Sequence, residues 1–253
     1  MWNSKLIFAM LLCGMAFTPA TVQAMCWQFD ATHVADDLIW PSEGGEAALR
    51  PVHGGSNGWS HAGTTVEVAR GVRRGVVSFE EGSSPFEFSE SATNFVREVW
   101  AVVRCREAAG LATLLDAPVD ARFEARVFEE EALRLQDEQL GNRSGYRVNG
   151  VAQRELAAAE ELQLVEVVFE TPVRMNEIFV GGAAASWRWG RGWRGEIGEL
   201  MFFERELSPA EREAVGDFVA LKWGVAAGKM NVGVLWELGI RTGSLYSTLL
   251  MVR

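Results

Sequence analysis

The sequence predicts an all-β protein, an antiparallel sandwich or barrel closed by one short C-terminal helix. Three observations favour it: short apolar or alternating runs recur between turn-rich breaks, a helix signal begins near residue 208, and the run before that helix is apolar on both faces. The runs are 64–69, 75–79, 86–88, 96–104, 122–128, 133–136, 146–148, 162–169, 177–180 and 196–203. This spacing favours a sandwich or barrel over alternating β and α units.

The first 24 residues are typical of a cleavable secretory signal. They carry one charge, Lys5, then an apolar run from Leu6 to Phe17 and a small-residue end at 22–24. An apolar core of about a dozen residues is shorter than the ~20 needed to span a bilayer. We therefore expect a secreted mature chain beginning at Met25, located outside the cell, at its surface or in the periplasm, with no membrane insertion after signal cleavage. Residues 25–224 are long enough for one domain, and 225–253 form an extension.

Two of the runs show how the strands are recognised. In 122–128, apolar Phe123, Ala125 and Val127 alternate with charged residues, which is the pattern of a half-buried strand. Asn149-Gly150 follows a later run and predicts a two-residue hairpin turn, because both central positions of such a turn need positive φ.

The helix is predicted from its ends and its apolar stripe. Ser208 can act as N-cap, with Pro209 at the first helical position and Glu211 completing a capping box. Gly224 is suited to end the helix. Between them an apolar stripe recurs at helical spacing, at Ala214, Val215, Phe218, Leu221 and Val225.

The segments on either side of this helix differ in how clearly they can be interpreted. Leu200 to Phe203 is apolar on both faces, which suits a strand covered by a second sheet on one side and by the helix on the other. The extension 225–253 is apolar but interrupted by Glu237, Arg241 and glycines, so it is not a spanning helix. It is expected to add a strand to the sandwich edge; docking as an irregular extension, or being the stump of a longer protein, are the alternatives.

The stretch 193–224 resembles the end of laminin-G-like (LamG, concanavalin A-like lectin/glucanase) domains of bacterial surface and secreted proteins. Those domains commonly close with G-x-I-x-E, a hydrophobic run, D/E-R-x-L-S-x-x-E-R-x-x-V-x-x-Y/F, further hydrophobic residues and a final K-W-G. The matching residues here are Gly195, Ile197, Glu199, Leu200 to Phe203, Glu204, Arg205, Leu207, Ser208, Glu211, Arg212, Val215, Phe218, Lys222, Trp223 and Gly224.

Weaker likenesses at 95–105, 145–151 and 177–182 extend the resemblance over roughly residues 26 to 224. The resemblance implies a two-sheet antiparallel jelly roll of the concanavalin A-like kind, whose usual role is binding to carbohydrate or to other proteins.

Charge and cysteine content restrict the partners and the chemistry. The formal net charge is −10, and loss of Lys5 with the signal makes the chain more negative, which opposes binding to nucleic acid or anionic lipid. Two cysteines survive cleavage, Cys26 and Cys105. An oxidising compartment would allow a disulfide between them; two buried free thiols are the alternative.

No catalytic set is recognisable. Glucanases of the concanavalin-like class resemble E-x-D-x-E, whose acids point into one cleft, whereas this chain has Glu196-Ile197-Gly198-Glu199. Glutamates three apart on a regular strand face opposite sides, and a glycine replaces the middle acid. We therefore expect no enzyme activity, and a divergent glycoside hydrolase is the least favoured alternative. Glu199 is better explained as a buried or half-buried structural acid.

Metal and cofactor sites are not predicted either. His53 and His61 lie near acidic residues, but their spacing matches no zinc motif. Calcium, which some LamG domains bind, is compatible with the chain but has no acidic loop of the D-x-D-x-D-G kind to hold it. We expect no cofactor and leave calcium unassigned.

The candidate ligand-binding residues are Trp187, Arg188, Trp189, Arg191 and Trp193 in the segment ASWRWGRGWRG. Indole faces stack on the apolar faces of sugar rings, and arginines bind hydroxyls or carboxylates. The alternative is that the tryptophans are structural, with Trp193 in the core. These observations predict a secreted, non-catalytic carbohydrate-binding or adhesive module that binds a glycan or a surface protein. A structural or protein-interaction module without sugar binding is the alternative.

Overall fold

The computed structural model describes residues 26–34, 39–43, 47–52, 59–60, 65–69, 72–79, 85–106, 112–117, 123–130, 132–136, 144–153, 156, 161–182, 193–225 and 231–242. The predicted signal peptide, 1–24, and the candidate residues Trp187, Arg188, Trp189 and Arg191 lie outside this part of the chain.

Within the described residues the protein is mostly β, and every strand pairing is antiparallel, as expected. The first seven-stranded sheet runs β13 (Ser144–Val148), β14 (Gln163–Arg174), β9 (Phe95–Cys105), β16 (Gly195–Phe203), β7 (Val77–Phe79) and β4 (Trp59–Ser60), with β1 (Cys26–Asp30) also paired to β16. We call it the helix-side sheet.

The second seven-stranded sheet, here the far sheet, runs β12 (Ala132–Gln136), β11 (Phe123–Glu130), β10 (Ala112–Ala117), β15 (Phe179–Val180), β8 (Phe86–Phe88), β3 (Ala48–Pro51) and β2 (Trp40–Pro41). A separate hairpin pairs β5 (Thr65–Ala69) with β6 (Val72–Gly75). Helices in the described residues are α2 (Pro209–Trp223), α3 (Val232–Glu237) and two 3-10 turns, Ala31–His33 and Met175–Glu177. Both large sheets are open in the described part of the chain.

The two large sheets share one inner core. Aromatic rings from both meet edge to face: Phe88 of β8 lies 5.1 Å from Phe202 of β16 and 5.6 Å from Phe29 of β1 between ring centroids. Phe79 and Phe86 make a similar pair at 5.9 Å. This common core gives the molecule a sandwich-like arrangement.

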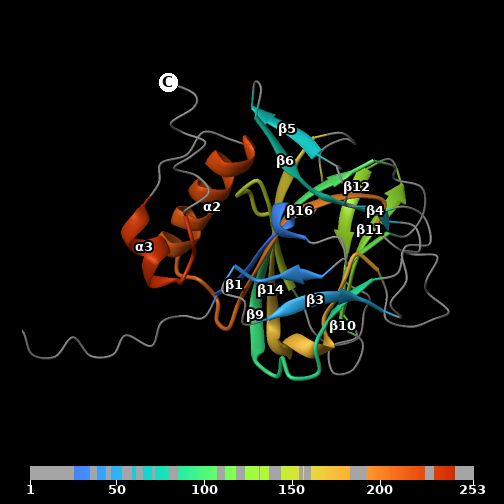
Figure 1. Cartoon of the computed structure of the whole chain (residues 1–253), viewed down its shortest axis with the longest axis horizontal. Helices are drawn as coiled ribbons and strands as arrows, with labels where there is room; N and C mark the ends of the chain where they lie inside the picture. Colours follow the sequence, from blue (N-terminus) through green and yellow to red (C-terminus); the bar gives the residue numbers. More distant parts are fainter. Residues whose placement is uncertain are drawn as a thin grey trace, which may run out of the picture.

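A second core lies on the opposite face of the helix-side sheet, where α2 and α3 form a third layer (Figure 1). Alternation along β16 places Leu200 and Phe202 in the inner core and Met201 and Phe203 under the helix. All of β16 is buried, which explains why it is apolar on both faces. The prediction of a strand covered by a sheet and by a helix is confirmed.

The local signals of α2 are also confirmed. The Ser208 hydroxyl accepts a hydrogen bond from the Glu211 amide and the Glu211 carboxylate accepts one from the Ser208 amide, so the capping box is present. Gly224 ends the helix at φ 66°, where a side chain would collide with the carbonyl oxygen of Val68. In the β13 turn, Asn149 and Gly150 both have positive φ, as predicted.

One sequence expectation is corrected, and the structure agrees with one of two open alternatives. Residues 231–242 of the extension contain the helix α3 and no edge strand, and their Leu235, Leu238 and Ile240 pack into the second core with α2. Cys26 and Cys105 are free cysteines. They pair with Phe203 and Gly195 at opposite ends of β16, roughly 26 Å apart at strand rise. A disulfide needs Cα atoms within about 7 Å, so this register does not match the disulfide alternative.

Candidate functional site: a groove beside α2

The C-terminal sequence pattern folds into a buried ionic lock between α2 and the helix-side sheet. The Lys222 ammonium lies 2.7 Å from Asp30 Oδ2 and 2.8 Å from Glu199 Oε1, and all three side chains are buried. Glu199 also accepts hydrogen bonds from the Trp223 indole and the Gln28 amide. The lock joins β1, β16 and the end of α2, so these matching residues serve the fold.

Gly198 makes room for this lock. A β-carbon there would lie 2.4 Å from the Trp223 ring, and the pairing of β16 with β9 shifts register between Ile197 and Glu199. This bulge changes which way the following residues face. Glu199 therefore lies on the same, helix-facing side as Glu196, and the expectation that they face opposite sides is wrong.

Glu196 and Glu199 are nonetheless separately neutralised. Glu196 is fully buried and pairs with Arg104, at 2.8 Å between Nε and Oε2, and with Arg106. Arg106 also donates to the Ser78 hydroxyl. Glu199 is held by the lock. Each carboxylate thus has fixed cationic partners.

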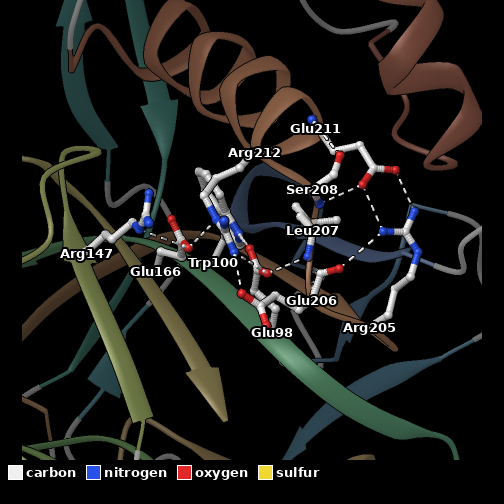
Figure 2. A network of polar contacts seen from close by, with 10 residues as sticks. All are labelled: Glu98, Trp100, Arg147, Glu166, Arg205, Glu206, Leu207, Ser208, Glu211 and Arg212. Atoms are coloured by element: carbon white, nitrogen blue, oxygen red, sulfur yellow. Dashed lines mark hydrogen bonds and ion pairs between the residues drawn. The ribbon is translucent and has the colours of Figure 1, made fainter. Parts of the chain in front are cut away.

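A second polar network lies at the other end of α2 (Figure 2). The buried Glu98 carboxylate accepts hydrogen bonds from the Trp100 indole at 2.5 Å and from the Leu207 amide at 2.8 Å. Arg212, from the first turns of α2, reaches the same carboxylate at 3.2 Å. The start of the helix is thereby fastened to β9.

Arg212 also contacts the neighbouring strand. Its Nε lies 2.5 Å from Glu166 Oε1 on β14, and Arg147 of β13 approaches the same oxygen at 3.7 Å. Glu206, just before α2, pairs with Arg212 at 3.4 Å. Figure 2 shows Glu166 between the two arginines. Three acids therefore share Arg212, whereas Arg147 has one distant partner among the described residues.

Burial and the neighbouring charges change the pKa of Glu166. Burial and the nearby charge of Glu98 raise the pKa of Glu166 to about 7, against the opposing effect of Arg212 and Arg147. Burial also raises the pKa of Glu98, although its hydrogen bonds oppose this. Glu166 can therefore gain or lose a proton near neutral pH.

Two adjoining cavities open around this network. The larger is about 370 Å³ and the smaller about 300 Å³, and Arg147, Glu166 and Arg212 line both. The larger has an apolar part formed by Trp100, Leu164, Ala220 and Val225 and a polar part that includes Asn149, Glu213 and Asp217. We call the two cavities together the α2 groove. It combines apolar surface with hydrogen-bond donors and acceptors, as ligand sites do.

The structure describes one of the five predicted ligand-binding residues, Trp193. Trp193 is 0% exposed and lies in the inner core, so it offers no face to a ligand and leaves the candidate set. Trp187, Arg188, Trp189 and Arg191 lie outside the described residues. Among the described residues no group of three or more metal-ligating side chains occurs, and no helix is long and apolar enough to cross a membrane.

The α2 groove was not predicted from the sequence. Arg147, Glu166 and Arg212 come from β13, β14 and α2, and no spacing relates them. The available signals were charged residues on strands with apolar neighbours, Arg147 beside Val148 and Glu166 within the run 162–169.

Comparison with known proteins gives no match: no protein-family model, no curated protein and no solved structure matches this chain.

Proposed function

We propose that this chain is a secreted, non-catalytic module with a LamG-like jelly-roll fold that binds carbohydrate in the α2 groove. The observation that carries the proposal is the composition of that groove. Guanidinium, carboxylate and amide groups line the groove together with apolar side chains, and sugars present both hydroxyls and apolar C–H surface to such a site.

Two features support the fold part of the proposal. Two antiparallel sheets share an inner core, and one helix covers the outer face of the sheet that contains β16. Three residues of the LamG-like pattern also act together, because Lys222 and Trp223 both donate hydrogen bonds to Glu199 in the ionic lock. Secretion is proposed from the first 24 residues.

The state of the acids supports a non-catalytic role. Glycoside hydrolysis needs two carboxyl groups that flank the scissile bond with access to substrate. Glu196 and Glu199 face the same side, but both are buried and ion-paired, so neither is available for that chemistry. Glu166 is buried and shared between two arginines.

A glycan array with the mature protein tests this function, run with and without calcium. Variants Arg147→Gln, in the groove, and Trp189→Ala, in the original candidate segment, distinguish the two locations. Arg50→Gln is the matched control, because Arg50 is exposed on β3 of the far sheet. Hits lost only in Arg147→Gln support the groove. Hits lost only in Trp189→Ala move the site to 187–191, and the absence of hits ends the sugar proposal.

One observation favours a protein-interaction module as the second candidate. Trp236 is 75% exposed and Val232 is 41% exposed, and their i, i+4 spacing puts them on one face of α3. Two exposed apolar side chains on one helix face suit a protein contact. Sedimentation velocity over a range of protein concentrations, repeated with Trp236→Ala, tests whether this face mediates self-association.

A further inference from the structure

We infer that the α2 groove recognises a saccharide that carries a carboxylate, and that Arg147 is the residue that binds this group. The inference rests on the proposed function and adds the class of ligand to it.

In the described part of the chain, Arg147 has one acidic partner, and this partner is distant. Its side chain is 40% exposed where the two cavities join. Of the described acids, the nearest to Arg147 is Glu166, at 3.7 Å between Arg147 Nε and Glu166 Oε1, which is too far for a hydrogen bond. An arginine presents several N–H donors in a planar fork that matches a carboxylate. The Arg147 guanidinium is therefore placed to bind a ligand carboxylate.

Arg212 is excluded from this role by its surroundings. It is only 12% exposed and is already paired with Glu98, Glu166 and Glu206. Its 2.5 Å contact to Glu166 also offsets the negative charge that would otherwise hold Arg147. The two arginines thus have different roles. Arg212 holds α2 against the helix-side sheet, and Arg147 lines the cavities.

The other charges around Glu166 orient the ligand. Glu98 approaches from β9, Arg147 from β13, Arg212 from α2 and Glu206 from the segment before α2. Glu213 and Asp217 line the α2 side of the larger cavity, and Arg97 and Glu170 line the smaller one. The acids of α2 repel a carboxylate but accept hydrogen bonds from hydroxyls. The ligand carboxylate therefore faces β13 and the sugar hydroxyls face α2.

Glu166 makes this recognition depend on pH. When protonated, it no longer attracts Arg147. The pKa of Glu166 is about 7, so about nine tenths of the molecules carry this proton at pH 6 and about one tenth at pH 8. Affinity for an acidic saccharide should then be higher at pH 6 than at pH 8, by at most about tenfold, which is the limit in which only the protonated form binds, with proton uptake on binding at the higher pH.

Isothermal titration calorimetry at these two pH values tests the inference. The probes are a galacturonate oligosaccharide, a neutral cello-oligosaccharide of equal length and a polyglutamate peptide. Arg147→Gln should weaken galacturonate binding by about tenfold or more, since a charge-assisted bidentate pair is lost. Glu166→Gln should bind galacturonate equally at both pH values, and Arg50→Gln should behave as the wild type. Circular dichroism melts establish that each variant is folded.

The results separate this inference from the function on which it rests. Preferred binding of galacturonate at pH 6, lost in Arg147→Gln, supports it. Binding of both sugars with equal affinity at both pH values overturns it and leaves the carbohydrate proposal standing. Equal binding of polyglutamate replaces the saccharide with an acidic peptide and overturns it. Absence of binding to either sugar, in agreement with an empty glycan array, overturns both proposals.

Discussion

Replacing Lys222 with methionine should strongly destabilise the protein. The substitution keeps the length of the side chain but removes the ammonium that lies 2.7 Å from Asp30 and 2.8 Å from Glu199. Two buried carboxylates then lose a counter-ion, and breaking a buried ion pair in this way costs about 3–5 kcal/mol. With a urea m-value of about 2 kcal/mol/M, the unfolding midpoint should fall by about 2 M. Urea titration followed by tryptophan fluorescence measures this shift.

The same substitution should change the pH dependence of stability. Burial alone would raise the pKa of Asp30, but the Lys222 ammonium and the Thr32 amide lower it below its usual value. In the wild type this contribution is present above the unfolded pKa of Asp30 and is lost as the pH falls through the folded value. Without Lys222, burial dominates and the Asp30 pKa rises. The stability deficit of Lys222→Met should therefore narrow as the pH falls from about 6 to about 4.

A second variant distinguishes charge from packing. Combining Lys222→Met with Asp30→Asn and Glu199→Gln removes all three charges but retains acceptor oxygens for Thr32 and Trp223. Replacing a whole buried ion cluster is often neutral or stabilising, so this triple variant should recover much of the lost stability. A deficit below about 1 kcal/mol in the single variant, or a triple variant that is no more stable than the single one, would refute the reasoning.

Two further variants test the bulge and the buried acid. Gly198→Ala places a β-carbon against the Trp223 ring and should cost about 1–3 kcal/mol in urea unfolding; wild-type stability would show that the ring is not seated there. Because the pKa of Glu166 is raised to about 7 when folded, its proton stabilises the native state at low pH. This contribution, about 3 kcal/mol, should be lost as the pH rises from about 5 to 7, and Glu166→Gln should remove that part of the slope. An unchanged slope would contradict the raised pKa.

The parts of the fold that were predictable depend on neighbouring residues. The capping box of Ser208 and Glu211 and the left-handed Gly224 are set within a few positions of the chain, so the ends of α2 could be located from sequence. The burial of Leu200 to Phe203 on both faces could be inferred because continuous apolar character is incompatible with an exposed face. Very short strands such as β2 and β4 have no such internal pattern and were not predicted.

The parts that were not predictable depend on register and on distant contacts. A regular two-residue period places Glu196 and Glu199 on opposite faces, but one extra residue at Gly198 reverses the second. The local sequence does not predict the bulge, because a glycine in a strand can equally mark a bend or the close approach of another group. The groove residues likewise meet only through the pairing of β13 with β14 and the docking of α2.

The two ends of α2 have different surroundings. The residues that stabilise the fold are therefore distinct from those of the proposed binding site. The C-terminal end, with Lys222 and Trp223, is fixed by buried partners, whereas Arg212 near the N-terminal end borders an open groove. The LamG-like pattern is densest where side chains are buried, so it reports how the helix is held. Under the proposed function, ligand choice depends instead on Arg147, which lies outside the dense pattern of 193–224. Variants of the lock should therefore lower stability without changing which ligand is bound, and Arg147→Gln should change binding at nearly constant stability, because a half-exposed ion pair contributes only about 0–1 kcal/mol.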